Sequence, residues 1–161
     1  MGSNERKHSG PPIQVVLGTD TEIVLGFRTV LLADPKLGTL TETYYWLRYA
    51  NGKPINGQTD AKGQLRVRTD WGDFVDIAIQ ARVKTRGIRV MLTKDPTSTP
   101  KGAWARLVNL GYVDMDQPPV EPTEEQLEQA LRRFQTKTGL PRTGKLEGAT
   151  PTRLDHDGRS V

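Results

Sequence analysis

The chain has 161 residues, of which 35% are hydrophobic and 26% are charged, which is ordinary for a soluble protein of one domain or two small ones. It contains no cysteine, which excludes disulfides, thiolate metal sites and cysteine nucleophiles. The net charge of +4 is small, and no apolar run is long enough to cross a bilayer. We therefore expect neither nucleic-acid binding nor membrane insertion.

The chain begins with a segment, residues 1–12, that is rich in charges and turn formers and shows no hydrophobic periodicity. We predict a flexible arm there, outside the fold. No apolar stretch typical of a secretory signal follows it, so we expect the protein to be made in the cytoplasm without a signal peptide.

The next region, residues 13–94, has the residue pattern of a β domain. Short runs of β-branched and aromatic residues alternate with turn formers, which is typical of an antiparallel sandwich or small barrel. Asn51-Gly52 and the stretch from Thr59 to Gly63 are predicted turns, and Pro54 predicts an edge strand or irregular crossing between them. The predicted strands are Ile13–Leu17, Ile23–Leu32, Thr43–Tyr49, Gln64–Thr69, Phe74–Val83 and Ile88–Leu92.

The residue pattern changes from strand-like to helical at a cluster of Pro, Ser and Thr, residues 94–100, where we place the domain boundary. Thr99 and Pro100 form a helix start, and Gly111 ends that helix. A second helix begins with a capping box at Thr123 and Gln126 and ends at Gly139.

A last short helix is expected to begin near residue 147 or 148 and to include Leu154. The predicted fold class is therefore α+β as separate domains, with a β-sandwich over 13–94 followed by a three-helix domain over 95–161.

Four ordered motifs in the helical region carry a family resemblance. They are Ala105–Tyr112 (ARLVNLGY), Ala130–Gln135 (ALRRFQ), Gly139–Gly144 (GLPRTG) and Leu146–Thr150 (LEGAT). Together they resemble the peptidoglycan-binding domain family, whose usual pattern is RLxNLGY, AxxxFQ, GLxxTG and DxxT. The loop over 113–122 departs from that family, because it lacks the glycines of the usual DGxxGxxT connection.

The resemblance implies a three-helix fold and peptidoglycan as a ligand. Polar and amphipathic side chains beside the glycine corners are the candidate contacts to sugar hydroxyls or stem-peptide carboxylates. Each also has a structural explanation, such as satisfying loop backbone, capping amides or filling the core. The candidates are Arg106, Asn109, Tyr112, Gln135 and Arg142.

In the β region, alternating cations are predicted to share strand faces that would suit an anionic partner, or act as a solvated face or charged edge. They are Arg66 and Arg68 on one strand, and Arg82, Lys84 and Arg86 on another. Aromatic residues near Trp46 alternate as well: Tyr45, Leu47 and Tyr49 share one face, and Tyr44, Trp46 and Arg48 share the other. One set is expected to be core, and the other is a candidate stacking surface for sugars.

Signals for catalysis are weak. The two histidines, His8 and His156, form no metal-binding pattern, and no carboxylate pair stands out from ordinary turn and capping roles. We therefore expect a non-enzymatic protein with no catalytic residue, no metal and no cofactor.

The β region also resembles transthyretin-like or carboxypeptidase-regulatory-like sandwiches, through Gly52–Gly57 and Gly57–Gln64. With the helical module, this architecture resembles accessory proteins of contractile injection systems, including type VI secretion and phage-tail-like machines. The resemblance implies a binding or adaptor protein whose partner is peptidoglycan or a protein of the assembly. It also implies delivery to the periplasm or cell exterior by the machine. The alternative is an accessory wall-targeting subunit of a peptidoglycan hydrolase.

Overall fold

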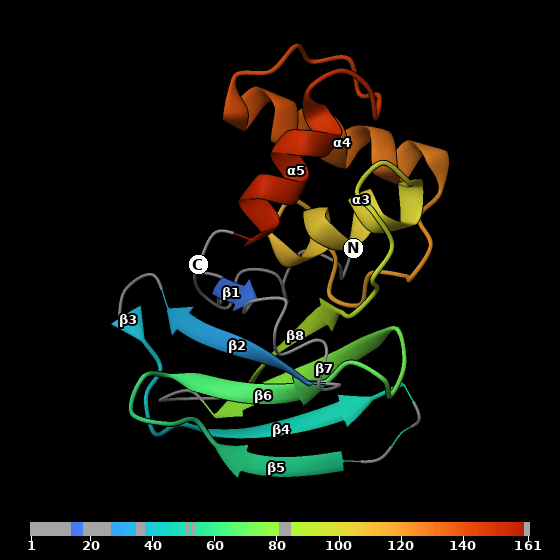
Figure 1. Ribbon diagram of the computed structural model, residues 1–161. Helices are drawn as coiled ribbons and strands as arrows, with labels where there is room; N and C mark the ends of the chain where they lie inside the picture. The colour runs from blue at the N-terminus through green and yellow to red at the C-terminus, as the bar shows by residue number, and fades with distance from the viewer. Residues whose placement is uncertain are drawn as a thin grey trace, which may run out of the picture.

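The computed structural model describes residues 14–17, 27–34, 38–50, 52, 54–80 and 85–159. Two antiparallel sheets come first in the chain and the helices follow, gathered together on one side of the sheets (Figure 1). This arrangement confirms the predicted fold class. The predicted arm over 1–12 lies outside the described residues.

The first sheet is built around β2 (Phe27–Asp34). One edge of β2 pairs with β1 (Gln14–Leu17), and the other pairs with β6 (Gln64–Arg68) and with the two-residue β3 (Gly38–Thr39). All of these pairings are antiparallel.

The second sheet has the strand order β5, β4, β7, β8. Its strands are β4 (Tyr44–Tyr49), β5 (Pro54–Gln58), β7 (Phe74–Gln80) and β8 (Thr85–Met91). Because Pro54 has no amide hydrogen to donate, its strand suits the edge that it occupies beside β4.

Strict alternation along the strands produces the sandwich core, because every second side chain points toward the opposite sheet. On β4, Leu47 and Tyr49 are buried while Tyr44 and Trp46 are exposed, which resolves the two alternatives for the aromatic run. The Tyr49 hydroxyl accepts a hydrogen bond from the Arg68 backbone N–H at 2.7 Å and so joins the two sheets. Both sheets contribute to the core, which contains Val30, Leu32, Leu47, Tyr49, Leu65, Val67, Val75, Ile77, Ile79, Val90 and Leu92.

Each of the six predicted strands has a counterpart among the described residues, but the ends of several differ from the prediction. β2 continues two residues past the predicted end at Leu32, and β8 begins three residues before the predicted start at Ile88. β3 was not predicted, because a two-residue strand has no periodicity of its own. Residues 18–26 and 81–84, which include parts of two predicted strands, lie outside the described residues.

Both predicted turns have local support. Gly52 has a φ of 86°, which favours glycine, while Asn51 lies outside the described residues. In the second turn, the Asp60 carboxylate accepts backbone N–H bonds from Lys62 at 2.8 Å and Gln64 at 2.9 Å. These bonds hold the pKa of Asp60 below its ordinary value.

The helices are α3 (Pro100–Asn109), α4 (Glu124–Thr138) and α5 (Thr150–Arg159). Thr99 caps α3, and the predicted capping box of α4 is present with both of its bonds, 3.1 Å and 2.9 Å long. Gly139 ends α4 with a φ of 77°. The predicted start of α5 was two to three residues early, since Gly148 adopts a φ of 61°. Of the helices that the structure describes, none has the length and apolar character needed to span a bilayer.

The helices enclose a second core that is separate from that of the sandwich. Trp104 and Phe134 are its largest fully buried side chains, and Tyr112 packs edge-on against Phe134 with ring centroids 5.3 Å apart. The buried members are Ala103, Trp104, Leu107, Ala130, Leu131, Phe134 and Leu154.

Candidate functional site

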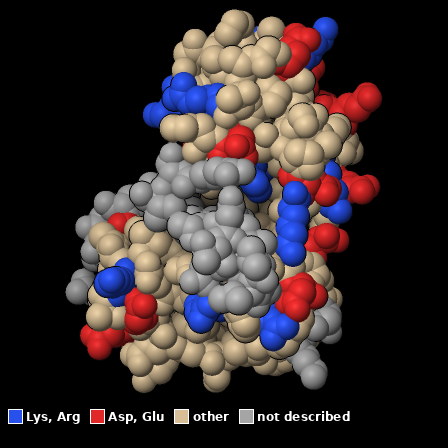
Figure 2. Space-filling view, viewed as in Figure 1, with Lys and Arg blue, Asp and Glu red and all other residues tan. Residues whose placement is uncertain are grey.

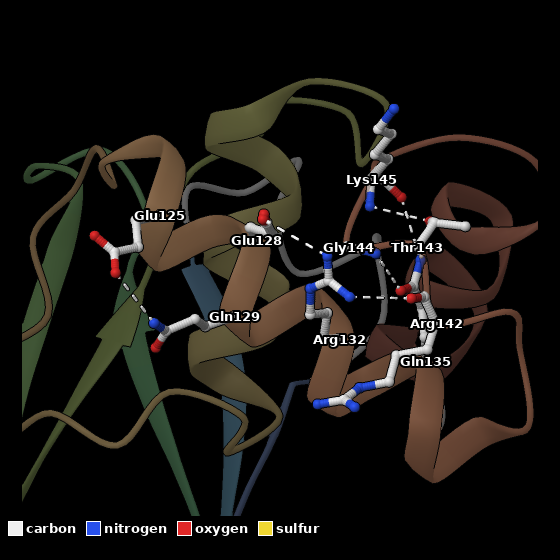
Figure 3. A network of polar contacts seen from close by, with 9 residues as sticks. All are labelled: Glu125, Glu128, Gln129, Arg132, Gln135, Arg142, Thr143, Gly144 and Lys145. Atoms are coloured by element: carbon white, nitrogen blue, oxygen red, sulfur yellow. Dashed lines mark hydrogen bonds and ion pairs between the residues drawn. The ribbon is translucent and has the colours of Figure 1, made fainter.

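Gln135 lies in the helical module, and its side chain is almost completely buried, with 1% of the residue exposed. Its amide nitrogen donates to Thr143 Oγ1 at 3.2 Å, to the Lys145 carbonyl at 3.2 Å and to Thr150 Oγ1 at 3.1 Å. Its amide oxygen accepts the Gly144 N–H at 2.8 Å. The side chain therefore fastens the loop over 141–145 to α4 (Figure 3) and is fully occupied by internal bonds.

The same loop is tied to α4 on its outer side. Arg132 reaches from α4 to the Arg142 carbonyl at 3.3 Å and also faces Glu128 at 3.8 Å (Figure 3). Gly144 has a φ of 73°, which favours glycine, and a Cβ there would lie 2.7 Å from Glu128 Cγ. Arg142 itself is exposed at the surface of the loop.

Asn109, at the end of α3, points to the sandwich. Its amide oxygen accepts the Met91 N–H at 2.8 Å, and its amide nitrogen donates to the Met91 carbonyl at 3.0 Å. The Asn109 amide therefore pairs with the backbone of β8 as a residue of a neighbouring strand would. Like Gln135, Asn109 therefore has a structural role in the fold.

Arg106 and Tyr112 both lie against α5. A Cβ at Gly158 would lie 2.7 Å from Arg106 Cδ, so the arginine stem passes directly over this glycine. Burial raises the pKa of the Tyr112 hydroxyl, the nearby Asp157 carboxylate adds to that rise, and Arg153 opposes it. Arg153 binds Asp157 through Nε at 3.0 Å and is itself about half exposed.

The five sequence-derived candidates therefore occupy three different places. Arg106 and Tyr112 share the α5 side, Gln135 and Arg142 belong to the 141–145 loop, and Asn109 is at the junction with β8. Arg153 was not among the candidates. Its spacing of four from Asp157 was visible in the sequence, but its proximity to Tyr112 depends on how the helices pack.

The loop over 113–122, which departs from the family pattern, is held by two long-range bonds. Trp104 donates its indole N–H to the Pro119 carbonyl at 2.7 Å, and Arg89 of β8 donates to the Pro118 carbonyl at 3.1 Å. Arg89 is also paired with Asp76 through two bonds of 2.7 and 3.0 Å. The carbonyls of Pro118 and Pro119 accept these bonds and so fix a loop in which the family's usual glycines are missing.

Of the predicted anionic-partner face, the structure describes the side chains of Arg66 and Arg68. Arg66 and Arg68 lie over the Phe27 ring, and Arg68 also lies over Trp71, with centroid distances of 5.0, 4.8 and 4.7 Å. Asp70 accepts two bonds from Arg68, and these lower the pKa of the Asp70 carboxyl. The charge of Arg68 is therefore already neutralised locally.

The other predicted strand of cations is not placed. Arg82 and Lys84 lie outside the described residues, and of Arg86 only the backbone is described. Figure 2 shows basic and acidic side chains interspersed over the face it presents. Among the described residues, no group of three or more His, Asp or Glu side chains is placed to hold a metal ion.

Residues 101–154 match the family model described as a putative peptidoglycan binding domain. The match runs from the second residue of α3 to Leu154 in α5 and so covers the helical core and the 141–145 loop. It supports a role for this module in cell-wall binding. Comparisons with curated proteins and with solved structures gave no match.

Proposed function

We propose that the helical module binds peptidoglycan on its α5 side, through Arg106 and Tyr112 with Arg153 beside them. The observation that carries the proposal is the family match over residues 101–154. Asn109 and Gln135 serve the fold, and Arg142 is on a different part of the module, which leaves the α5 side as the place where candidates gather.

The chemistry of this side suits the polymer. Both guanidinium groups carry N–H donors that suit stem-peptide carboxylates and remain charged at any physiological pH, although the charge of Arg153 is offset by its partner Asp157. Tyr112 offers a hydroxyl at the rim of an aromatic pair, which can bond a sugar hydroxyl while its ring stays packed against Phe134.

We further propose that the chain is a non-catalytic adaptor whose sandwich docks on a protein assembly of the contractile injection or secretion type. The resemblance of the two-part architecture to accessory proteins of such machines supports this. The bonds of Asn109 and Arg89 across the junction also support it, because they would transmit a fixed orientation from a docked sandwich to the module.

Sedimentation of the full chain with insoluble peptidoglycan at low salt tests the wall-binding half. We expect the chain in the pellet, and we expect Arg106→Gln and Tyr112→Phe to reduce the sedimented fraction. Arg142→Gln is the matched control, since it removes an exposed arginine from the same module, and it should sediment like the parent chain.

Failure of the full chain to sediment would overturn peptidoglycan binding. Release of soluble muropeptides during the incubation would overturn the non-catalytic assignment. The adaptor half is tested separately by affinity purification of the full chain from its source cells, where we expect co-purification of an injection-machine component.

A further inference from the structure

The outer face of the second sheet carries two aromatic side chains that the proposed function does not use. Tyr44 is 61% exposed and Trp46 is 40% exposed, although both belong to a six-residue strand whose alternate residues are core. Arg48 follows on the same face. Tyr44, Trp46 and Arg48 therefore form a row along β4, which we call the β4 row.

The residues beside Trp46 leave its ring accessible. In the strand register, Trp46 is flanked by Asn56 on β5 and Ala78 on β7, and Ala78 is followed by Gly87 on β8. A Cβ at Gly87 would meet nothing nearer than 3.9 Å. Small residues thus continue outward from one side of the indole, and an amide lies on the other.

Another part of this face, around Arg89, is already paired. Arg89 binds Asp76, lies 3.9 Å from the centroid of the Phe74 ring, and bonds the Pro118 carbonyl of the helical module. The module therefore contacts the sheet at the β8 end, while Tyr44 and Trp46 lie on β4 and remain exposed.

We propose that the β4 row is a second carbohydrate site, which binds a β-1,4-linked glycan chain by stacking sugar rings on Tyr44 and Trp46. Side chains two residues apart on one strand face are separated by about 7 Å, so neighbouring sugars of one chain can reach both rings. Aromatic faces pack against the apolar faces of pyranose rings, and the Asn56 amide is in position to bond their hydroxyls.

Arg48 supplies charge complementarity at the end of the row. The stem peptides of peptidoglycan carry carboxylates, and an exposed guanidinium is a suitable partner for them. The identity of the polymer rests on the proposed function of the helical module. The site itself rests on the sandwich alone.

Other occupants fit the β4 row less well. An apolar protein partner would be expected to meet branched aliphatic side chains, whereas the cross-strand neighbours of Trp46 on this face are Asn56 and Ala78. A single-stranded nucleic acid would be expected to need a basic groove, whereas Arg89, the described cation on β8, is neutralised by Asp76.

Isothermal titration calorimetry of the full chain with a soluble β-1,4-linked N-acetylglucosamine pentamer tests the site. We expect binding, and we expect Trp46→Ala to weaken it about tenfold, which corresponds to ~1.4 kcal/mol. Trp46→Phe should restore most of the affinity, because it keeps an aromatic face. Trp46→Leu should not, because it keeps apolar area without that face.

Ile55→Ala is the matched control, because Ile55 is an exposed apolar residue of the same sheet whose register partner is the inward-facing Leu47. It should bind the pentamer like the parent chain. Absence of pentamer binding, equal affinity of Trp46→Ala and parent, or equal affinity of Trp46→Leu and parent would each overturn the proposal. Tighter, steeply salt-dependent binding of a single-stranded oligonucleotide through Trp46 would overturn it as well.

The two experiments distinguish loss of the β4 site from loss of peptidoglycan binding by the helical module. A chain that sediments with peptidoglycan through Arg106 and does not bind the pentamer would remove the β4 site alone. A chain that binds the pentamer through Trp46 while Arg106→Gln leaves sedimentation unchanged would remove the assignment to the helical module alone and support the β4 site.

Discussion

Gln135 and Asn109 have the same functional group and use it in the same way, as a donor and an acceptor for backbone at a distance in the sequence. Gln135 bonds the Gly144 N–H and the Lys145 carbonyl, and Asn109 bonds both backbone groups of Met91. In the sequence each was consistent with backbone capping as well as with ligand contact. The difference depends on which way the side chain points, and tertiary packing decides that.

Replacing Gln135 tests its role in holding the 141–145 loop. Gln135→Leu conserves much of the volume but leaves the Gly144 N–H and Lys145 carbonyl without a partner in a buried place. We expect a loss of about 2–4 kcal/mol in the free energy of unfolding, measured by urea denaturation. Gln129→Leu, at an exposed position of the same helix, should change it by less than about 0.5 kcal/mol.

Gln135→Glu adds a pH dependence to this loss. Burial would raise the pKa of the introduced carboxyl above its unfolded value of about 4.3, so the folded state would bind the proton more tightly than the unfolded state. The destabilisation should therefore be larger at pH 7 than at pH 4.5. A loss that is equal at both pH values would show that the side chain is not held in the buried position.

At the scale of the element, local chemistry allowed the most accurate predictions. The cap at Thr99, the capping box of α4 and the left-handed end at Gly139 are interactions within a few residues, so the sequence contains all of their parts. β3 and the Arg89–Asp76 pair could not be predicted in this way. They depend on strand register, which brings together residues whose spacing in the chain does not indicate that they are neighbours.

The α4 capping box gives a test with a control on the same helix. Thr123→Ala removes the acceptor of the Gln126 N–H, and we expect it to lower the free energy of unfolding by about 1 kcal/mol. Thr136→Ala, exposed near the end of α4, should leave stability unchanged or slightly raised because alanine favours helix. Equal effects of the two substitutions in thermal or urea unfolding would contradict the assigned cap.

The turn at Asp60 provides a pH test within the sandwich. Its carboxylate accepts two backbone N–H bonds, which depress its folded pKa, so its contribution is present above the unfolded pKa of about 3.9 and is lost as pH falls through the folded value. We expect the Lys62 and Gln64 amide resonances to move together in an NMR titration below pH 4. Asp60→Asn should abolish that acid transition, and its persistence would contradict the assignment.

At the scale of the whole molecule, specific hydrogen bonds join the two separate cores. Asn109 bonds Met91, Arg89 bonds the Pro118 carbonyl, and Thr97 donates to the Pro151 carbonyl at 2.9 Å. The change in residue pattern at 94–100 predicted the boundary between the β region and the helical region. It could not predict this junction, because its partners lie on β8, the 113–122 loop and α5.

Asn109→Ala tests whether that junction couples the two cores. It removes both bonds to Met91, and we expect a loss of about 1–3 kcal/mol, together with faster hydrogen exchange at the Met91 amide. Asn109→Asp keeps an acceptor for the Met91 N–H but loses the donor to its carbonyl, so that amide should stay more protected than in the alanine variant. If Met91 exchange is the same in Asn109→Ala as in the parent chain, other contacts hold the module on β8, and the orientation argument for an adaptor loses this support.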